Sequence, residues 1–186
     1  MITKLSWNCI IKARVWEIDQ KRNINLFFAY AQKDERFASE LEKHLFALRH
    51  QRMISMWSAR QVVAGSVREE AVQQYLLAAD IILVLLSADF LASDYAYSQE
   101  MMQALRRHHI GEAIVIPIIL RSCSWENTPF AKLQALPPGA LPIALWADRD
   151  AAFYSIVQAI ESVYDQIQWQ PGGSSPDGNA TRSAGF

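Results

Sequence analysis

Short apolar runs alternate with amphipathic stretches along most of this chain. Five runs of strand length, rich in aliphatic or aromatic residues, cover residues 26–30, 53–57, 81–86, 114–120 and 141–146. The third run, Ile81 to Leu86, contains no polar position, which is typical of a strand buried on both faces. Pro117 lies inside the fourth run and predicts a bulge or an edge strand, because proline cannot donate a hydrogen bond to a neighbouring strand.

The stretches between these runs have the apolar spacing of helices. The first helix carries apolar positions four, four and three residues apart: Phe37, Leu41, Leu45 and Leu48. It follows Asp34, which can cap a helix N-terminus. Ser66 and Glu69 form a capping-box pattern before the second helix. We expect the third helix over 95–109 and the last one from Asp150 onward.

This alternation of strands and helices predicts an α/β protein with five parallel strands and helices on both faces of the sheet. A chain of 186 residues is long enough for one domain with a substantial core. We expect this domain over residues 24–168, after an N-terminal extension over 1–23. Residues 169–186 include PGGSSPDGNATRSAGF, which has the composition of a flexible linker.

Composition and charge argue against several kinds of partner. The formal net charge is −1, so electrostatics favour neither nucleic acid nor an anionic membrane. The longest apolar run, about seven residues, is far below the roughly 20 that cross a bilayer. Cys9 and Cys123 lie far apart in no metal-binding spacing, which indicates reduced thiols in a cytoplasmic protein. The adjacent His108 and His109 diverge on a helix, so no metal site is expected.

Nucleotide-binding loops and phosphorylation sites of the usual kinds are missing. The predicted domain contains only Gly65, Gly111 and Gly139, and neither G-x-G-x-x-G nor G-x-x-x-x-G-K-[ST] occurs. A phosphorylated receiver domain shows the same alternation but requires an aspartate at the end of the third strand. This chain has Ser87 at that position.

The segment after the third strand is the strongest candidate for chemistry. A short polar and aromatic loop follows Ser87, and the next predicted helix carries Glu100 about a turn and a half from its start. Ligands of open parallel α/β sheets bind beyond the carboxyl ends of the strands. The segments FAYAQKDE and WSARQVVAGS follow the first two strands and would converge on the same edge. Glu100 is therefore placed where a catalytic carboxylate would lie.

Four segments, in order and at the right spacing, resemble the TIR (Toll/interleukin receptor) domains of bacteria over roughly residues 24–165. LFFAYAQKDERF is similar to the first box of this family, F-I-S-Y-S-x-x-D, with Ala29 and Ala31 in place of the serines. WSARQVVAGSVREE resembles the BB loop, and the segment with Glu100 resembles the catalytic-glutamate region. Ala96 stands four residues before the glutamate, where Trp or Cys is common. IVIPIIL, followed by Trp125 and TPFAKLQALP, resembles the fourth-strand region.

The resemblance implies a flavodoxin-like fold and, as in many members, cleavage of NAD⁺ at the nicotinamide–ribose bond. It implies that Glu100 is the catalytic glutamate and that NAD⁺ is a substrate, with no cofactor. The substrate-binding residues that it implies are Phe28, Ala29, Tyr30, Trp57, Arg60 and Tyr97. It also implies self-association through the apolar tip of the BB loop, at Val62, Val63, Ala64 and Gly65, as an exposed apolar patch suggests. An immune-type or toxin effector, or a signalling protein, fits these features.

Two other functions remain open. A non-catalytic module with the same fold would signal only through contacts between TIR domains. An enzyme similar to nucleoside deoxyribosyltransferases could use the same glutamate on a similar fold. Structural roles are also open, because the helix dipole alone favours a glutamate early in a helix and Trp57 at a strand end is typical of a core.

Overall fold

The computed structural model of the chain describes residues 22–58, 61 and 67–169. Within this part, four strands form one parallel sheet in the order β2-β1-β3-β4. The strands are β1 (Ile24–Ala29), β2 (Ile54–Ser58), β3 (Ile81–Leu86) and β4 (Ile114–Ile119). Every residue of β3 is buried, as the apolar run predicts. The predicted α/β class with a parallel sheet is confirmed.

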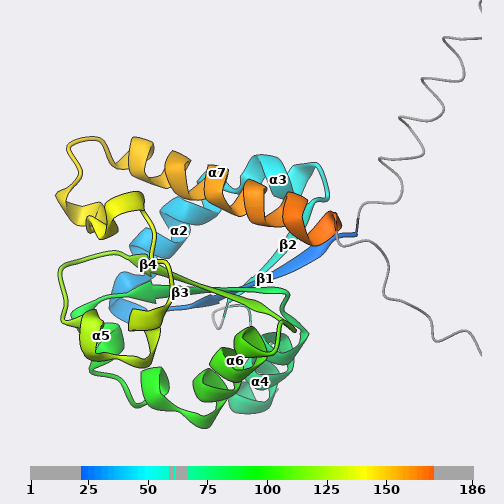
Figure 1. Ribbon diagram of the computed structural model, residues 1–186, viewed down its shortest axis with the longest axis horizontal. Helices are drawn as coiled ribbons and strands as arrows, with labels where there is room; N and C mark the ends of the chain where they lie inside the picture. Colours follow the sequence, from blue (N-terminus) through cyan, green and yellow to red (C-terminus); the bar gives the residue numbers. More distant parts are fainter. Residues whose placement is uncertain (1–21, 59–60, 62–66, 170–186) are drawn as a thin grey trace, which may run out of the picture.

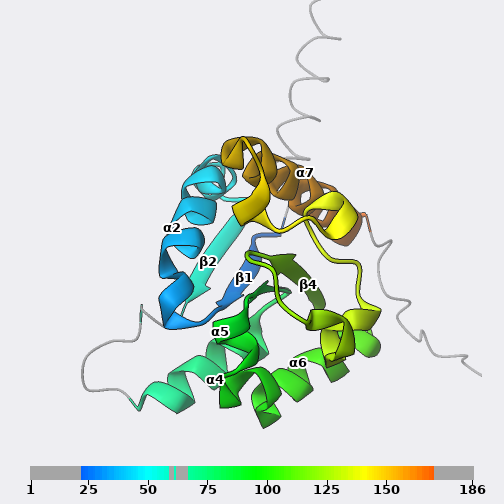
Figure 2. The same cartoon turned by 90° about the vertical axis from the view of Figure 1, so that its left-hand side faces the viewer.

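Helices cover both faces of this sheet, as Figures 1 and 2 show. One face carries α2 (Glu35–His44), α3 (Phe46–His50) and α7 (Arg149–Gln168). The other carries α4 (Arg68–Ala78), α5 (Ala88–Leu91) and α6 (Gln99–His109). Each face has its own hydrophobic cluster, and neighbouring residues of a strand enter different clusters. Phe28 belongs to the cluster under α2 and α7, whereas Phe27 belongs to the cluster under α4 and α6.

The fifth strand expected over 141–146 is not formed in the described part of the chain. Residues Ile143–Leu145 form a short 3₁₀ helix, η7, directly after Pro142, which has no N–H to offer a strand. A single bridge from Leu136 lies beside β4 instead. The Leu136 N–H donates to the Pro117 carbonyl at 2.8 Å, and the Ile119 N–H donates to the Leu136 carbonyl at 2.8 Å. Pro117 thus lies in an edge strand, as its position in the sequence predicts.

The helix expected over 95–109 is divided. Residues Asp94–Tyr97 form a 3₁₀ helix, η3, and α6 begins at Gln99. Ser98 separates them, because its backbone is extended (φ −63°, ψ 162°) and its hydroxyl accepts a hydrogen bond from the Met101 N–H at 3.3 Å. Glu100 is therefore the second residue of a helix, and its expected position a turn and a half from the start is wrong.

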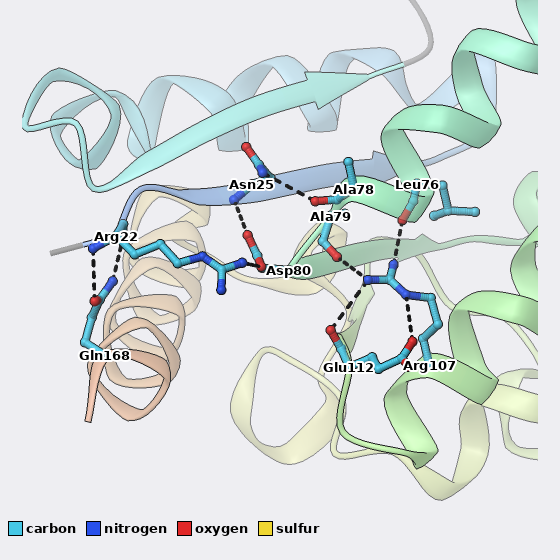
Figure 3. Close-up of polar contacts among 9 residues, drawn as sticks. All are labelled: Arg22, Asn25, Leu76, Ala78, Ala79, Asp80, Arg107, Glu112 and Gln168. Carbon is cyan, nitrogen blue, oxygen red and sulfur yellow. Dashed lines mark hydrogen bonds and ion pairs between the residues drawn. The ribbon is translucent and has the colours of Figure 1, made fainter. Parts of the chain in front are cut away.

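The two ends of the described chain lie side by side at the amino-terminal edge of the sheet (Figure 3). The Arg22 N–H donates to the Gln168 side-chain oxygen at 3.1 Å, and the Gln168 amide donates to the Arg22 carbonyl at 2.6 Å. The Arg22 guanidinium pairs with Asp80, which precedes β3 and also accepts the Asn25 N–H at 2.9 Å. Because Glu100 follows the carboxyl end of β3, the chain ends and the candidate site lie at opposite edges. Residues 1–21 and 170–186, the greater part of the predicted extension and tail, lie outside the described residues.

Candidate functional site

The strand order creates a switch point between β1 and β3. The chain continues from β1 to β2 on one side and from β3 to β4 on the other. In sheets of this topology the crevice beyond the carboxyl ends of these two strands is where ligands bind. Residues that follow β1 and β3 therefore decide what the crevice contains.

A buried polar network links the segments that follow β1, β3 and β4. Asp34, which is 1% exposed, accepts a hydrogen bond from the fully buried Ser87 hydroxyl. Arg121 donates to the same carboxylate from Nη2 at 2.7 Å and from Nε at 3.1 Å. The Arg121 guanidinium also reaches Asp89 at 2.5 Å, and Lys33 contacts Asp89 at 2.8 Å. The network joins three strand ends at the switch point.

Opposite charges in this network lie in direct contact. Hydrogen bonds to Asp89 first, and to Asp34 second, raise the pKa of Arg121 above its ordinary value. The Lys33 ammonium, followed by Arg121, lowers the pKa of Asp89. Lys33, Asp89 and Arg121 are therefore charged near neutral pH. Asp34 stands at the N-cap position of α2 but makes no capping hydrogen bond, so the capping role expected from the sequence is wrong.

Serine side chains make local hydrogen bonds along the segment that joins this network to Glu100. Ser87 also accepts the Phe90 N–H at 3.1 Å and so starts α5. The Ser93 hydroxyl donates to the Phe90 carbonyl at 2.6 Å, and the Ala96 N–H donates to the Ser93 carbonyl at 3.2 Å. Ser98 then starts α6. The position of Glu100 therefore follows from a continuous set of local hydrogen bonds anchored on Asp34.

Glu100 is half-buried in the first turn of α6, and its negative charge acts on Tyr95. The pKa of Tyr95 is raised, mainly by burial and also by the negative charge of Glu100. The Tyr95 oxygen is buried, and no hydrogen-bond partner for it is found in the described part of the chain. A neutral phenol and a carboxylate therefore lie near each other at the carboxyl edge of the sheet.

The structure separates the residues that the resemblance assigns to substrate binding. Phe28 and Ala29 are buried, and they face opposite sides of the sheet. Tyr30 is half-buried against the same cluster as Phe28. Tyr97 is 52% exposed and lies in η3, on the connection that carries Glu100.

Trp57 lies between two aromatic rings. Its ring centroid is 4.1 Å from that of Tyr75 and 5.4 Å from that of Phe27, and both pairs are stacked. The side chain is 9% exposed and belongs to the hydrophobic cluster under α4 and α6. Trp57 is thus a core residue, as its position at a strand end suggests. Arg60 and the predicted self-association residues Val62, Val63, Ala64 and Gly65 lie outside the described residues.

Sequence reasoning missed Tyr95, Arg121 and the true role of Asp34. Arg121 directly follows the fourth apolar run, and that position at a strand end was the available signal. Tyr95 and Tyr97 lie in the same short aromatic segment, and the sequence does not show which of them has a buried hydroxyl.

Among residues 22–58, 61 and 67–169, no group of three or more His, Cys, Asp and Glu side chains could hold a metal ion. The described helices are all too short or too polar to span a bilayer. A cavity of about 450 Å³, lined by Arg49, Arg52 and Ser55 among others, opens at the amino-terminal edge, away from Glu100.

Comparison with known proteins identifies the family. The sequence model of the TIR domain family matches residues 26–157. An uncharacterised protein of Sinorhizobium fredii, y4lF, is 45% identical over 143 residues, which cover 77% of this chain and 44% of that protein. The chain thus spans less than half of this relative.

Solved structures overlap more loosely. The TIR domains of the activated Roq1 resistosome, which directly recognises the pathogen effector XopQ, share 15% identity with this chain. That match covers 79% of each chain with a TM-score of 0.43. A conserved protein from Enterococcus faecalis also shares 15% identity, over 54% of this chain and 66% of its own, with a TM-score of 0.39. Because the family model covers most of the described domain, the chain belongs to the TIR domain family.

Proposed function

We propose that this TIR domain cleaves NAD⁺ at the nicotinamide–ribose bond, with Glu100 as the catalytic carboxylate. The observation that carries the proposal is the position of Glu100, half-buried in the first turn of α6 beyond the carboxyl end of β3. A helix N-terminus favours the ionised form of a carboxylate. This edge of the sheet is also where ligands of such folds bind.

One carboxylate is sufficient for this reaction. Nicotinamide leaves NAD⁺ as a neutral molecule, so no second group is needed to protonate it, in contrast to ordinary glycoside hydrolysis. An anion beside the ribose stabilises the oxocarbenium-like transition state and can orient the water or hydroxyl that attacks it. NAD⁺ serves here as a substrate, and the reaction requires no cofactor. A cytoplasmic effector of immune or toxin type is consistent with such an activity.

The test compares wild-type protein with the Glu100→Gln variant by chromatography of the products formed from NAD⁺. Glutamine keeps the shape of the side chain and removes the charge, so we expect activity to fall at least about 100-fold with little change in melting temperature. Glu69→Gln is a matched control, because Glu69 is also the second residue of a helix but is exposed on α4. Residual Glu100→Gln activity above about one tenth of wild type would contradict the assignment.

We also propose that the active form is a homo-oligomer assembled through the BB loop. Val62 and Val63 are apolar residues of a predicted loop tip, and exposed apolar patches often form contacts between proteins. Specific activity should then fall steeply on dilution. Replacing both valines with aspartate should give a folded monomer without activity. Constant specific activity across a hundredfold dilution, with a fully active double variant, would contradict assembly.

A non-catalytic interaction module is the second candidate. Ala29 and Ala31 offer no hydroxyl to a substrate, and the polar groups of Asp34, Ser87 and Arg121 at the switch point are already bonded to one another. Under this alternative, the protein would assemble but leave NAD⁺ intact at high concentration. Nucleosides included beside NAD⁺ in the same assay would reveal an activity of the deoxyribosyltransferase type.

A further inference from the structure

Tyr95 carries a hydroxyl that the fold buries without satisfying. Its oxygen is shielded from water and has no hydrogen-bond partner among the residues that the structure describes. The ring packs edge-on against the fully buried Phe90, with centroids 6.4 Å apart and planes at 82°. A buried polar group without a partner destabilises a protein, so phenylalanine would suit this position better if the hydroxyl had no task.

Glu100 is a carboxylate close enough to act electrostatically on this hydroxyl. The two residues flank the break between η3 and α6, and the charge of Glu100 acts on the Tyr95 hydroxyl. Within the described residues, the Glu100 side chain makes no hydrogen bond or ion pair. Burial and this charge both raise the pKa of Tyr95, so the phenol stays protonated and remains a donor near neutral pH.

A bound substrate would favour a hydrogen bond between Tyr95 and Glu100. In the free protein Glu100 is half-exposed, so water can solvate its carboxylate. A substrate that covers the carboxylate removes this water, and a desolvated carboxylate needs another donor to remain ionised. Rotation of the Glu100 side chain toward Tyr95 satisfies both the buried hydroxyl and the desolvated carboxylate.

We propose that Tyr95 is a positioning residue whose hydroxyl donates a hydrogen bond to Glu100 when substrate occupies the site. This inference rests on the proposed NAD⁺ cleavage. The hydrogen bond holds the carboxylate in one orientation and keeps it charged beside the ribose, where positive charge develops in the transition state. Tyr97 is unsuited to this task, because it is 52% exposed and its hydroxyl can be satisfied by water.

The test is the Tyr95→Phe variant, which removes one oxygen and keeps the packed ring. We expect kcat for NAD⁺ cleavage to fall about tenfold, less than for a donor that touches the reacting atoms. KM should stay within about twofold, because the bond acts in the transition state. The melting temperature should stay the same or rise, because a buried unpaired oxygen is removed. Tyr154→Phe is the matched control, since Tyr154 is exposed on α7, where its hydroxyl accepts from Gln158 at 3.1 Å.

The outcomes separate this inference from the proposed function. An unchanged kcat in Tyr95→Phe, beside an inactive Glu100→Gln variant, would overturn the role of Tyr95 and leave the proposed function standing. A lower melting temperature in Tyr95→Phe would also overturn it, because the hydroxyl would then have a partner in the free protein. A wild-type protein that leaves NAD⁺ intact would overturn the proposed function, and the inference with it.

Discussion

Substituting Arg121 with methionine removes the cation that compensates Asp34 in the protein interior. Methionine keeps much of the length of the side chain, so the change acts mainly on charge and hydrogen bonding. The Asp34 carboxylate would lose two hydrogen bonds, at 2.7 and 3.1 Å, and keep the one from Ser87. A carboxylate that is 1% exposed can regain from water only part of what it loses.

The magnitude follows from the burial of the two partners. Removing one partner of a buried ion pair destabilises a protein by about 3–5 kcal/mol. The Arg121 side chain is 38% exposed, so water can enter part of the space that it leaves. We therefore expect the lower end of this range, about 3 kcal/mol, which corresponds to about 10 °C in melting temperature for a domain of this size.

Urea unfolding at pH 7, followed by tryptophan fluorescence, measures this loss. Arg36→Met is the matched control, because Arg36 is 82% exposed and pairs with Glu40 one turn away, so its loss should lower the free energy of unfolding by less than about 0.5 kcal/mol. The Asp34→Asn/Arg121→Met double variant should lose clearly less stability than the sum of the two single changes. A loss below about 1 kcal/mol for Arg121→Met, or additive single changes, would refute the reasoning.

Three further outcomes are expected. Arg107 donates to the carbonyls of Leu76 and Ala79 at the end of α4 (Figure 3). Arg107→Met should therefore lower the free energy of unfolding in urea by about 2 kcal/mol. Arg106→Met, at an exposed position, should leave it almost unchanged. Burial raises the pKa of the Cys123 thiol, so iodoacetamide should label it more slowly in the native protein than in urea, as mass spectrometry of its peptide would show; equal rates would contradict this. The Lys33 ammonium lowers the pKa of Asp89 below the ordinary 3.8, so its stabilisation is present above that value and is lost as the pH falls through the lowered one. Asp89→Asn should therefore reduce the pH dependence of stability below about pH 4, and an unchanged profile would contradict the pairing.

The sequence by itself determined the four strands, most of the helices and the edge at which Glu100 lies. These features depend on local spacing: an apolar run gives a buried strand such as Ile81 to Leu86, and a period near 3.6 gives an amphipathic helix. The carboxyl edge follows from the alternation of strands and helices, because each crossover brings the chain back in the same direction. The TIR resemblance and the family match over residues 26–157 rest on this same ordered information.

Only the tertiary structure decided which partner each polar side chain meets. Asp34 precedes a helix in a position suited to capping, yet its carboxylate binds Ser87 and Arg121, which lie 53 and 87 residues further along the chain. Residues 141–146 have the composition of a strand, but Leu136 occupies the outer side of β4. Tyr95 and Tyr97 differ by two positions in one short 3₁₀ helix, where successive residues point about 120° apart, so the Tyr95 hydroxyl is buried and Tyr97 is exposed. Such choices depend on which distant segments meet, and local spacing carries no information about that.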